Sequence, residues 1–571
     1  MVVKVKTKRK WIVTSAWPYI NAVPHLGNLI GSVLSADVFA RYCRLKGDDV
    51  VFVSGSDEHG TPVAVAALQQ NLSCEELIKR NHKYIKELFE RWDISYDNYT
   101  ETHNPIHFEF TQHFFKVIEK NNYIFTKEEE VLYCQNCNLY LPDRFIEGTC
   151  PNCKFIGARG DQCDNCGKLL TPTQLIDYYC KSCGKKNIEI RKSKHWYMNF
   201  PKLEHKLRKF IDSDKFTPNT INICKNFIKD GIPARAITRD LEWGIPAPFE
   251  GAVNKVIYVW FEAVLGYLSA VKEWAEKIKG DSNLFSYFWK DKNSKSVYFI
   301  GKDNIIFHLI IFPGLIFAYN DRFPEKEKLT LPYNVSTTEF LMYESGKFSK
   351  SKNRGIWIDE ALEIVPVDYW RYYLIRNRPE LKDTSFLWEE FITSITEMND
   401  VIGNFIHRIL IFIKNNFYSI VPKPQDYDEE DKKIVEIINI KIKKIEGLFE
   451  DIKLKNAFKE IITLAREGNK YFNDKQPWHL IKEDKEKVGT ILYICIQLVN
   501  ILSILLCPII PNSSKKIFNL INKPENLELH NWNELESFSI KPGEKINNPI
   551  PLFKKYKMKV LLDKYNKIKK K

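Results

Sequence analysis

Two short segments of the chain carry side chains suited to phosphate chemistry. His25-Leu26-Gly27-Asn28 opens an apolar-periodic helix soon after the strand-like run 11–15, and Lys347-Phe348-Ser349-Lys350-Ser351 lies in a basic loop rich in glycine and serine. A helix N-terminus with imidazole and glycine binds phosphate, and paired lysines stabilise the charge that develops as pyrophosphate leaves. Alone, a histidine before glycine is usually a cap, and lysines in such a loop are usually solvated. Together, the two segments predict an ATP site.

Eight of the 13 cysteines form four C-x-x-C pairs. Two such pairs complete a closed tetrahedral Cys₄ zinc site, which is structural rather than catalytic. The short gap between Cys153 and Cys163 favours one site from the inner four cysteines, with the outer four closing around it. A redox role needs a single pair in a βαβ setting, and the sequence predicts neither. The predicted inner site is Cys150, Cys153, Cys163 and Cys166, and the outer site is Cys134, Cys137, Cys180 and Cys183.

The elements that must position these side chains alternate between strands and helices at the N-terminal end. Buried-strand runs at 11–15 and 50–54 flank a helix with one apolar face, which is typical of a doubly wound parallel sheet in an α/β fold. The cysteine-rich stretch interrupts this pattern. Strand-like runs return at 255–260 and 296–300. The sequence therefore predicts a split nucleotide-binding fold whose second half lies near 225–335.

Long amphipathic helices follow residue 393. A stripe of apolar residues from Ile434 to Phe449 lies among lysines and glutamates and predicts an antiparallel helix bundle. The segment 488–514 has no charged residue, but polar residues and prolines interrupt it. We expect a buried bundle helix there rather than a membrane span, and we expect no second segment of this kind.

Size and charge set the remaining bounds. A chain of 571 residues holds three or four domains, and its 44% hydrophobic and 27% charged residues are typical of a soluble globular protein. The net charge of +13 suggests a polyanionic partner or serves solubility alone. The last 18 residues hold nine lysines, which predicts either a solvated tail or a non-specific RNA contact. No targeting signal is expected, which indicates a cytoplasmic protein without structural disulfides.

Further segments give the chain a specific resemblance. They are Ala16-Trp17-Pro18-Tyr19-Ile20-Asn21, Ser56-Asp57-Glu58-His59-Gly60-Thr61-Pro62, Ile237-Thr238-Arg239-Asp240-Leu241, Tyr258-Val259-Trp260-Phe261-Glu262-Ala263, Gly301-Lys302-Asp303-Asn304 through His308, and Gln476-Pro477-Trp478. With the two signature segments, the chain resembles the methionyl-tRNA synthetases, a family of class I aminoacyl-tRNA synthetases, over nearly its whole length. The four cysteine pairs resemble those of its two-knuckle, archaeal-like branch.

The resemblance implies a domain order. It begins with a split Rossmann catalytic domain and an inserted zinc-knuckle module, and it ends with an α-helix bundle that binds the anticodon. The implied segments are 1–122 and 225–335 for the catalytic halves, 123–224 for the insertion, 336–392 for a linker carrying the lysine loop, 393–545 for the bundle and 546–571 for a basic tail.

The resemblance also implies a reaction and its residues. Methionine would react with ATP and Mg²⁺ to give methionyl-adenylate and pyrophosphate, and would then pass to the terminal ribose of initiator and elongator tRNA(Met). The implied catalytic residues are His25, Lys347 and Lys350, joined at the ATP by Gly27, Asn28 and Ser349. The implied methionine site is Ala16, Trp17, Tyr19, Asp57, Trp260, Ala263, Tyr267 and His308. The implied anticodon contacts are Asn404, Arg408, Pro477 and Trp478.

Several alternatives stay open at this stage. A synthetase for another amino acid shares both signature segments, although those for isoleucine, valine and leucine usually carry a larger insertion. A non-catalytic RNA-binding paralogue is a second alternative, against which intact His25, Lys347 and Lys350 argue. Trp260 on a strand and Trp478 in a bundle could be core residues. Val264 replaces a proline common in relatives. We expect a monomer, with or without a separate tRNA-binding protein, and no membrane partner.

Overall fold

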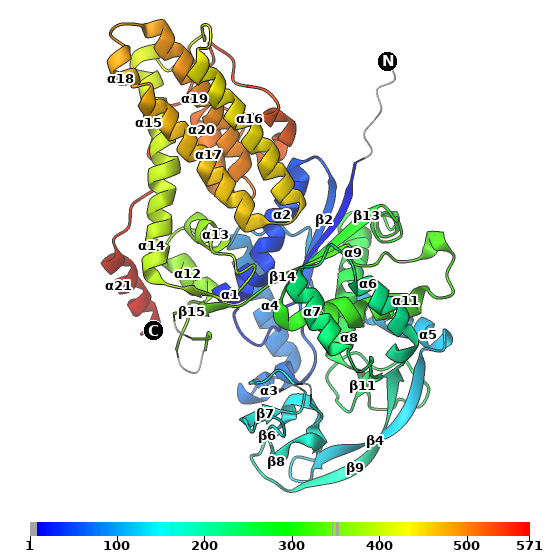
Figure 1. Ribbon diagram of the computed structural model, residues 1–571. Coiled ribbons are helices and arrows are strands. Elements are labelled where there is room, and N and C mark those ends of the chain that lie inside the picture. Colours follow the sequence, from blue (N-terminus) through cyan, green and yellow to red (C-terminus); the bar gives the residue numbers. More distant parts are fainter. Residues whose placement is uncertain are drawn as a thin grey trace.

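The computed structural model describes residues 8–570 except 162, 164, 169, 345 and 350–352, and its centre is a five-stranded parallel sheet (Figure 1). Near-continuous apolar runs form its strands because helices cover both faces. The chain leaves β1 toward β2 on one side and later fills the other side with β13 and β14, so the carboxyl ends of β1 and β13 flank a crevice. The predicted doubly wound α/β fold is confirmed. In spatial order the strands are β14 (Asn334–Thr338), β13 (Ser294–Gly301), β1 (Lys10–Ser15), β2 (Asp49–Ser56) and β3 (Asn98–Glu101).

One continuous helical segment connects β1 to β2. It begins as α1 (Leu26–Asn28), passes through a π-helical stretch at Leu29–Val33 and continues as α2 (Leu34–Leu45). Its predicted apolar face is buried against the sheet. The N-terminus of this segment therefore lies at the carboxyl end of β1, where ligands bind in such folds.

The cysteine-rich stretch leaves the sheet after α5 (Pro105–Lys120) as a long two-stranded arm. In the arm, β4 (Ile124–Cys134) pairs antiparallel with β9 (Ile188–Met198) over its whole length, from Ile124↔Met198 to Cys134↔Ile188. A small sheet of β7 (Ile156–Arg159), β6 (Ile146–Thr149) and β8 (Ile176–Cys180) lies at the end of this arm, at the bottom of Figure 1.

The strand predicted at 255–260 is wrong. Only β12 (Val256–Ile257) is extended, and it pairs with β11 (Thr238–Arg239) outside the central sheet. The chain then turns into α8 (Val259–Glu262), because the amides of Phe261 and Glu262 both donate to the Tyr258 carbonyl. A short apolar run does not distinguish a strand from a buried helical turn.

The helix bundle stands at the top of Figure 1. The apolar stripe of α16 packs against α17 and α19, as predicted. The most apolar 18-residue window of α19 is 94% buried, which confirms a core helix. Contrary to expectation, Lys302–Asn320 is also long and apolar enough for a span by composition, and 67% of its window is buried. The bundle helices are α14 (Trp388–Glu397), α15 (Asn404–Phe417), α16 (Glu429–Glu450), α17 (Leu454–Asp474), α18 (Pro477–Leu480), α19 (Lys485–Leu506) and α20 (Pro511–Leu520).

The lysine-rich C-terminal segment is a docked helix rather than a solvated tail. Helix α21 (Met558–Lys569), red in Figure 1, packs beside α14 and α12 (Ile358–Ile364). Leu561 is fully buried there, and the Lys569 ammonium lies 2.7 Å from the Glu360 carboxylate. The remaining α-helices and β-strands are α3 (Thr61–Gln69), α4 (Cys74–Arg91), β5 (Leu139–Tyr140), α6 (Glu204–Ile211), α7 (Pro218–Phe227), β10 (Arg235–Ala236), α9 (Gly266–Glu273), α10 (Asn283–Trp289), α11 (Phe312–Asn320), β15 (Leu341–Tyr343), α13 (Val367–Arg376) and β16 (Thr384–Phe386).

Candidate functional site

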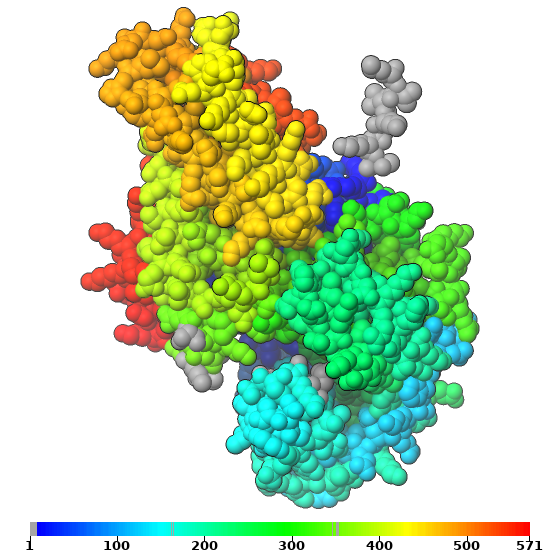
Figure 2. Space-filling model, viewed as in Figure 1, coloured from blue at the N-terminus to red at the C-terminus, as the bar shows by residue number. Residues whose placement is uncertain are grey.

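A cavity of about 440 Å³ opens at the carboxyl ends of β1, β2 and β13. In Figure 2 a hollow lies between the cysteine-rich module and the rest of the chain, with blue N-terminal atoms at its floor. The cavity brings both signature segments together, because His25 and Lys347 both line it. The predicted site residues that line it are Ala16, Trp17, Tyr19, His25, Gly27, Asn28, Asp57, Trp260 and Lys347.

His25 caps the helix that begins at Leu26. Its Nδ1 accepts the backbone N–H of Asn28 at 3.2 Å, and the Asn28 side chain accepts the backbone N–H of His25 at 3.1 Å. Burial lowers the pKa of His25 to about 4, so the ring is neutral with its proton on Nε2. A Cβ at Gly27 would lie 3.0 Å from this ring. The arrangement leaves one N–H donor on the imidazole and a helix N-terminus for an anion.

The lysine loop is held by its own backbone. Ser349 and Arg354 exchange two backbone hydrogen bonds, and the Arg354 guanidinium donates to the Lys347 carbonyl at 2.8 Å. Phe348 is stacked on His25. Gly355 has φ +136°, and a Cβ there would lie 2.4 Å from the Phe348 ring, so the turn requires glycine. Lys350, a predicted catalytic residue, lies outside the described residues.

Asp57 forms the polar end of the cavity. It is 4% exposed, and among the residues that the structure describes its Oδ1 has no hydrogen-bond partner. Backbone hydrogen bonds with Pro18 and Ile20 fix it beside the chain that follows β1. Tyr19 and Trp260 meet edge to face at 5.8 Å and give the cavity aromatic walls. An unpaired buried carboxylate oxygen beside aromatic walls suits a ligand with a cationic head and an apolar tail.

Three predicted residues of this slot do not line the cavity. Ala263, Tyr267 and His308 are buried outside its lining, and the Tyr267 hydroxyl lies 2.7 Å from His308 Nε2. Trp17, which does line the cavity, packs edge-on against Tyr267 at 6.4 Å. Tyr267 therefore lies directly beneath Trp17, with His308 beside it.

Sequence reasoning missed several residues of the lining. Arg144, from the inserted module, lies 5.6 Å from the Tyr19 ring and reaches the cavity across the hollow. Asp303 and Asn304 line it from the segment after β13. This segment belongs to the family resemblance, but no role in the site was expected for either residue. Glu339 also lines it and binds Lys302 at 2.8 Å. For Arg144 no signal in the sequence existed, because the fold of the insertion brings it there.

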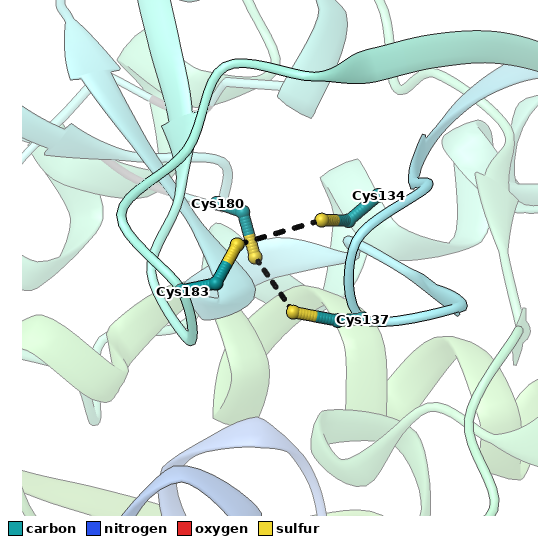
Figure 3. Close-up of side chains that lie close together, drawn as sticks. All are labelled: Cys134, Cys137, Cys180 and Cys183. Atoms are coloured by element: carbon teal, nitrogen blue, oxygen red, sulfur yellow. Dashed lines mark hydrogen bonds between the residues drawn. The ribbon is translucent and has the colours of Figure 1, made fainter.

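The eight paired cysteines form two nested clusters, each of which could hold a metal ion (Figure 3 shows the outer one). Sulfur–sulfur distances between pairs are 3.7 and 3.8 Å in the outer cluster and 3.6 and 3.9 Å in the inner cluster. The Asn165 amide lowers the pKa of Cys153 to about 6, which favours the thiolate that a metal needs. The predicted pairing is confirmed as geometry. Of the five other cysteines, four are buried, and Cys74 is half-buried.

A second site lies on the helix bundle. The guanidinium of Arg408, on α15, lies 5.8 Å from the ring of Trp478, and Trp478 is 39% exposed. The Arg408 side chain also donates to Asn473 at 2.8 Å. Asn404 is exposed one turn away, whereas Pro477 is buried at the start of α18. Trp478 is therefore a surface residue, and with Arg408 and Asn404 it forms an exposed aromatic and polar patch, from which Pro477 is absent.

The parallel sheet and a cavity shared by an imidazole at a helix N-terminus and a lysine loop define a class I tRNA synthetase. Sequence models of "tRNA synthetases class I (M)" and of the "Anticodon binding domain of methionyl tRNA ligase" match residues 11–410 and 421–567. The chain belongs to the methionine–tRNA ligase family.

The relatives support this membership over nearly full length. The chain is 46% identical to the methionine–tRNA ligase of Thermofilum pendens over 552 residues, 96% of each chain. It is 49% identical to that of Ignicoccus hospitalis over 549 residues, 96% of this chain and 95% of the relative. The structure of Mycobacterium tuberculosis methionyl-tRNA synthetase with methionyl-adenylate shares the fold, with a TM-score of 0.79 at 24% identity, over 96% of this chain and 100% of that one.

Proposed function

We propose that this chain activates methionine with ATP and then transfers it to the 3′-terminal ribose of tRNA(Met) for translation initiation and elongation. One observation carries the proposal: a single cavity holds the His25 helix terminus and Lys347 together with the unpaired Asp57 oxygen. In the first step the methionine carboxylate forms a bond to the α-phosphorus of ATP as the bond to pyrophosphate breaks. Such a reaction needs orientation and charge stabilisation rather than a covalent nucleophile.

The phosphate end follows from the state of His25. Because its Nδ1 accepts from Asn28, its Nε2–H is the donor for an ATP phosphate. The absence of a side chain at Gly27 lets adenine pack on the backbone. We assign Lys347, Ser349 and Lys350 to the departing pyrophosphate, and Mg²⁺ to the phosphates of ATP.

The amino-acid end uses different chemistry. Asp57 Oδ1 accepts from the methionine ammonium, with the backbone of Ala16 and Trp17 beside it. Tyr19 and Trp260 contact the thioether, which packs favourably on aromatic rings. Ala263, Tyr267 and His308 would shape this pocket from beneath Trp17.

Two further assignments complete the proposal. Each Cys₄ cluster holds a structural Zn²⁺, because four thiolates in a closed set suit that ion. Trp478 stacks on an anticodon base of tRNA(Met), with Arg408, Asn404 and Pro477 around it, since single-stranded bases are recognised by aromatic stacking.

The remaining assignments concern organisation. We infer a cytoplasmic monomer, alone or with a separate tRNA-binding protein, and the domain limits 1–122, 123–224, 225–335, 336–392, 393–545 and 546–571. Homologous translation enzymes support the location, and the interrupting arm between β4 and β9 supports the division of the catalytic fold.

The proposal is tested by ATP–pyrophosphate exchange on the purified protein with each of the twenty amino acids. Exchange with methionine alone is expected, followed by methionylation of tRNA(Met). Exchange with another amino acid would overturn the pocket assignment and keep the class. A lack of exchange with all twenty, in folded and zinc-loaded protein, would favour a non-catalytic RNA-binding role.

A further inference from the structure

A buried carboxylate lies behind the amino-acid end of the cavity. Glu262, on α8 two residues after Trp260, is fully buried and does not line the cavity. Its Oε1 lies 2.8 Å from His59 Nδ1, and its Oε2 lies 2.7 Å from His107 Nε2. A carboxylate in this environment is retained only if both oxygens are well bonded. Here each oxygen has its own imidazole donor.

The hydrogen bonds continue beyond both histidines. His107 Nδ1 lies 2.7 Å from the Ser269 hydroxyl, and His59 Nε2 lies 3.0 Å from Nδ1 of half-buried His103. If both buried histidines donate to the carboxylate, their other ring nitrogens face the Ser269 hydroxyl and His103 as acceptors. The network joins the loop after β2 to α5, α8 and α9. Four segments of the chain are therefore held to one buried carboxylate.

This network ends at Asp57. Asp57 precedes His59 by two residues in the same loop, the His59 backbone favours the charged form of the Asp57 carboxyl and lowers its pKa, and the His59 ring is held by Glu262. The ring and the backbone belong to one residue, so holding the His59 ring also holds the loop backbone that carries Asp57. At the cavity, Asp57 Oδ1 has no hydrogen-bond partner within the described part of the chain.

The two carboxylates also act on each other. Burial, and next the charge of Glu262, raise the pKa of Asp57 well above its usual range. Glu58 acts in the same direction, and Arg144 opposes it. Tyr19 also faces Asp57. Asp57 and Glu262 repel each other when both are ionised. A bound cation offsets this repulsion, and the α-ammonium of a free amino acid is such a cation.

We propose that Glu262 is a positioning residue for amino-acid binding, which orients Asp57 through His59 and adds a second negative charge that favours the α-ammonium. The proposal rests on the proposed function, since it assigns Glu262 to the same amino-acid end. Glu262 itself does not touch the ligand. Its role differs from a structural one in that it sets the affinity for the amino acid without setting the affinity for ATP.

The test compares Glu262→Gln with the wild type in two assays, methionine binding followed by tryptophan fluorescence without ATP, and ATP–pyrophosphate exchange. We expect the KM and Kd for methionine to rise at least tenfold, with kcat and the KM for ATP within twofold. Removing a like charge lowers the pKa of Asp57. Methionine binds more tightly once Asp57 is deprotonated, so the KM for methionine falls as the pH rises through the pKa of Asp57. In the variant we expect this fall in KM at lower pH. Asp368→Asn, which removes another buried carboxylate at the contact of α13 with α20, is the matched control.

A second pair of variants keeps the test independent of the folding of Glu262→Gln. In His59→Asn the amide reproduces the Nδ1 donor, whereas His59→Ala removes it. We expect His59→Asn to keep the KM for methionine within threefold and His59→Ala to raise it tenfold. Unchanged methionine affinity in Glu262→Gln, or equal losses for methionine and ATP, would overturn the proposal. A wild type that neither binds methionine nor supports exchange would overturn the proposed function as well.

Discussion

The rings of His25 and Phe348 lie parallel, with centroids 4.2 Å apart and planes 5° from coplanar. This contact joins the helix N-terminus after β1 to the lysine loop from the other half of the catalytic fold. His25 also forms a backbone bridge with Trp357, just beyond the loop. His25 and the loop that carries Lys347 are therefore positioned by each other.

Replacing Phe348 tests this coupling. An aromatic pair of this kind contributes about 0.5–1.5 kcal/mol, so Phe348→Ala should lower kcat/KM for ATP by roughly 2–12-fold in pyrophosphate exchange. Phe348→Met keeps apolar volume at this position and should stay within about twofold. An unchanged kcat/KM for ATP in Phe348→Ala would show that the stack has no role in adenylation.

The nested cysteine clusters predict two zinc ions per chain. Cys153→Ser and Cys183→Ser should each lose one equivalent of zinc in metal analysis, because each removes a ligand from a different cluster. The double variant should lose both. If Cys153→Ser released both ions, the two sites would not be independent, and the nested assignment would need revision.

Trp478→Ala separates tRNA recognition from activation. Loss of one stacked base costs about 1–3 kcal/mol, so the KM for tRNA(Met) should rise roughly 5–150-fold while pyrophosphate exchange stays unchanged. Tyr418→Ala, which removes another exposed aromatic of the bundle, is the control and should leave tRNA charging unaffected. Equal effects of the two changes would contradict a specific role for Trp478.

Helix α21 braces the segment that follows the lysine loop. The Tyr565 hydroxyl donates to the Gly355 carbonyl at 3.1 Å, and the Lys569 ammonium lies over the Trp357 ring at 4.2 Å. The double change Tyr565→Phe and Lys569→Ala removes a hydrogen bond and an ion pair, together about 1–2 kcal/mol. We expect several-fold slower pyrophosphate exchange and faster proteolysis near residue 350. Lys567→Ala, on the exposed face of α21, should change neither.

Parts of this structure were predictable because local pattern determines them. The buried runs that became β1 and β13 needed only residue type, and the short gap between Cys153 and Cys163 favoured the cysteine grouping that the structure has. Helix α21 was hidden by its lysines, although Leu561, Tyr565 and Ile568 recur at helical spacing on the packed face. Charge count is therefore a poor guide where long lysine side chains border an apolar face.

Other parts depend on contacts between distant segments. No local pattern places Arg144 of the insertion in the cavity, or Phe348 on His25. The resemblance grouped Tyr267 and His308 with Trp260, but it did not show which side of Trp17 each occupies. Trp260 itself lies on a helical turn because of main-chain hydrogen bonds to Tyr258, which hydrophobicity does not encode.

The nesting of the two cysteine clusters also orders the folding of the module. The inner cluster is closed by Cys153 and Cys163, ten positions apart, whereas Cys137 and Cys180 of the outer cluster are 43 positions apart. Closing the longer loop costs about 1.3 kcal/mol more chain entropy. Once the inner cluster has formed, it shortens the path between the outer pairs and reduces that cost. Chain entropy therefore favours closure of the inner cluster before the outer one.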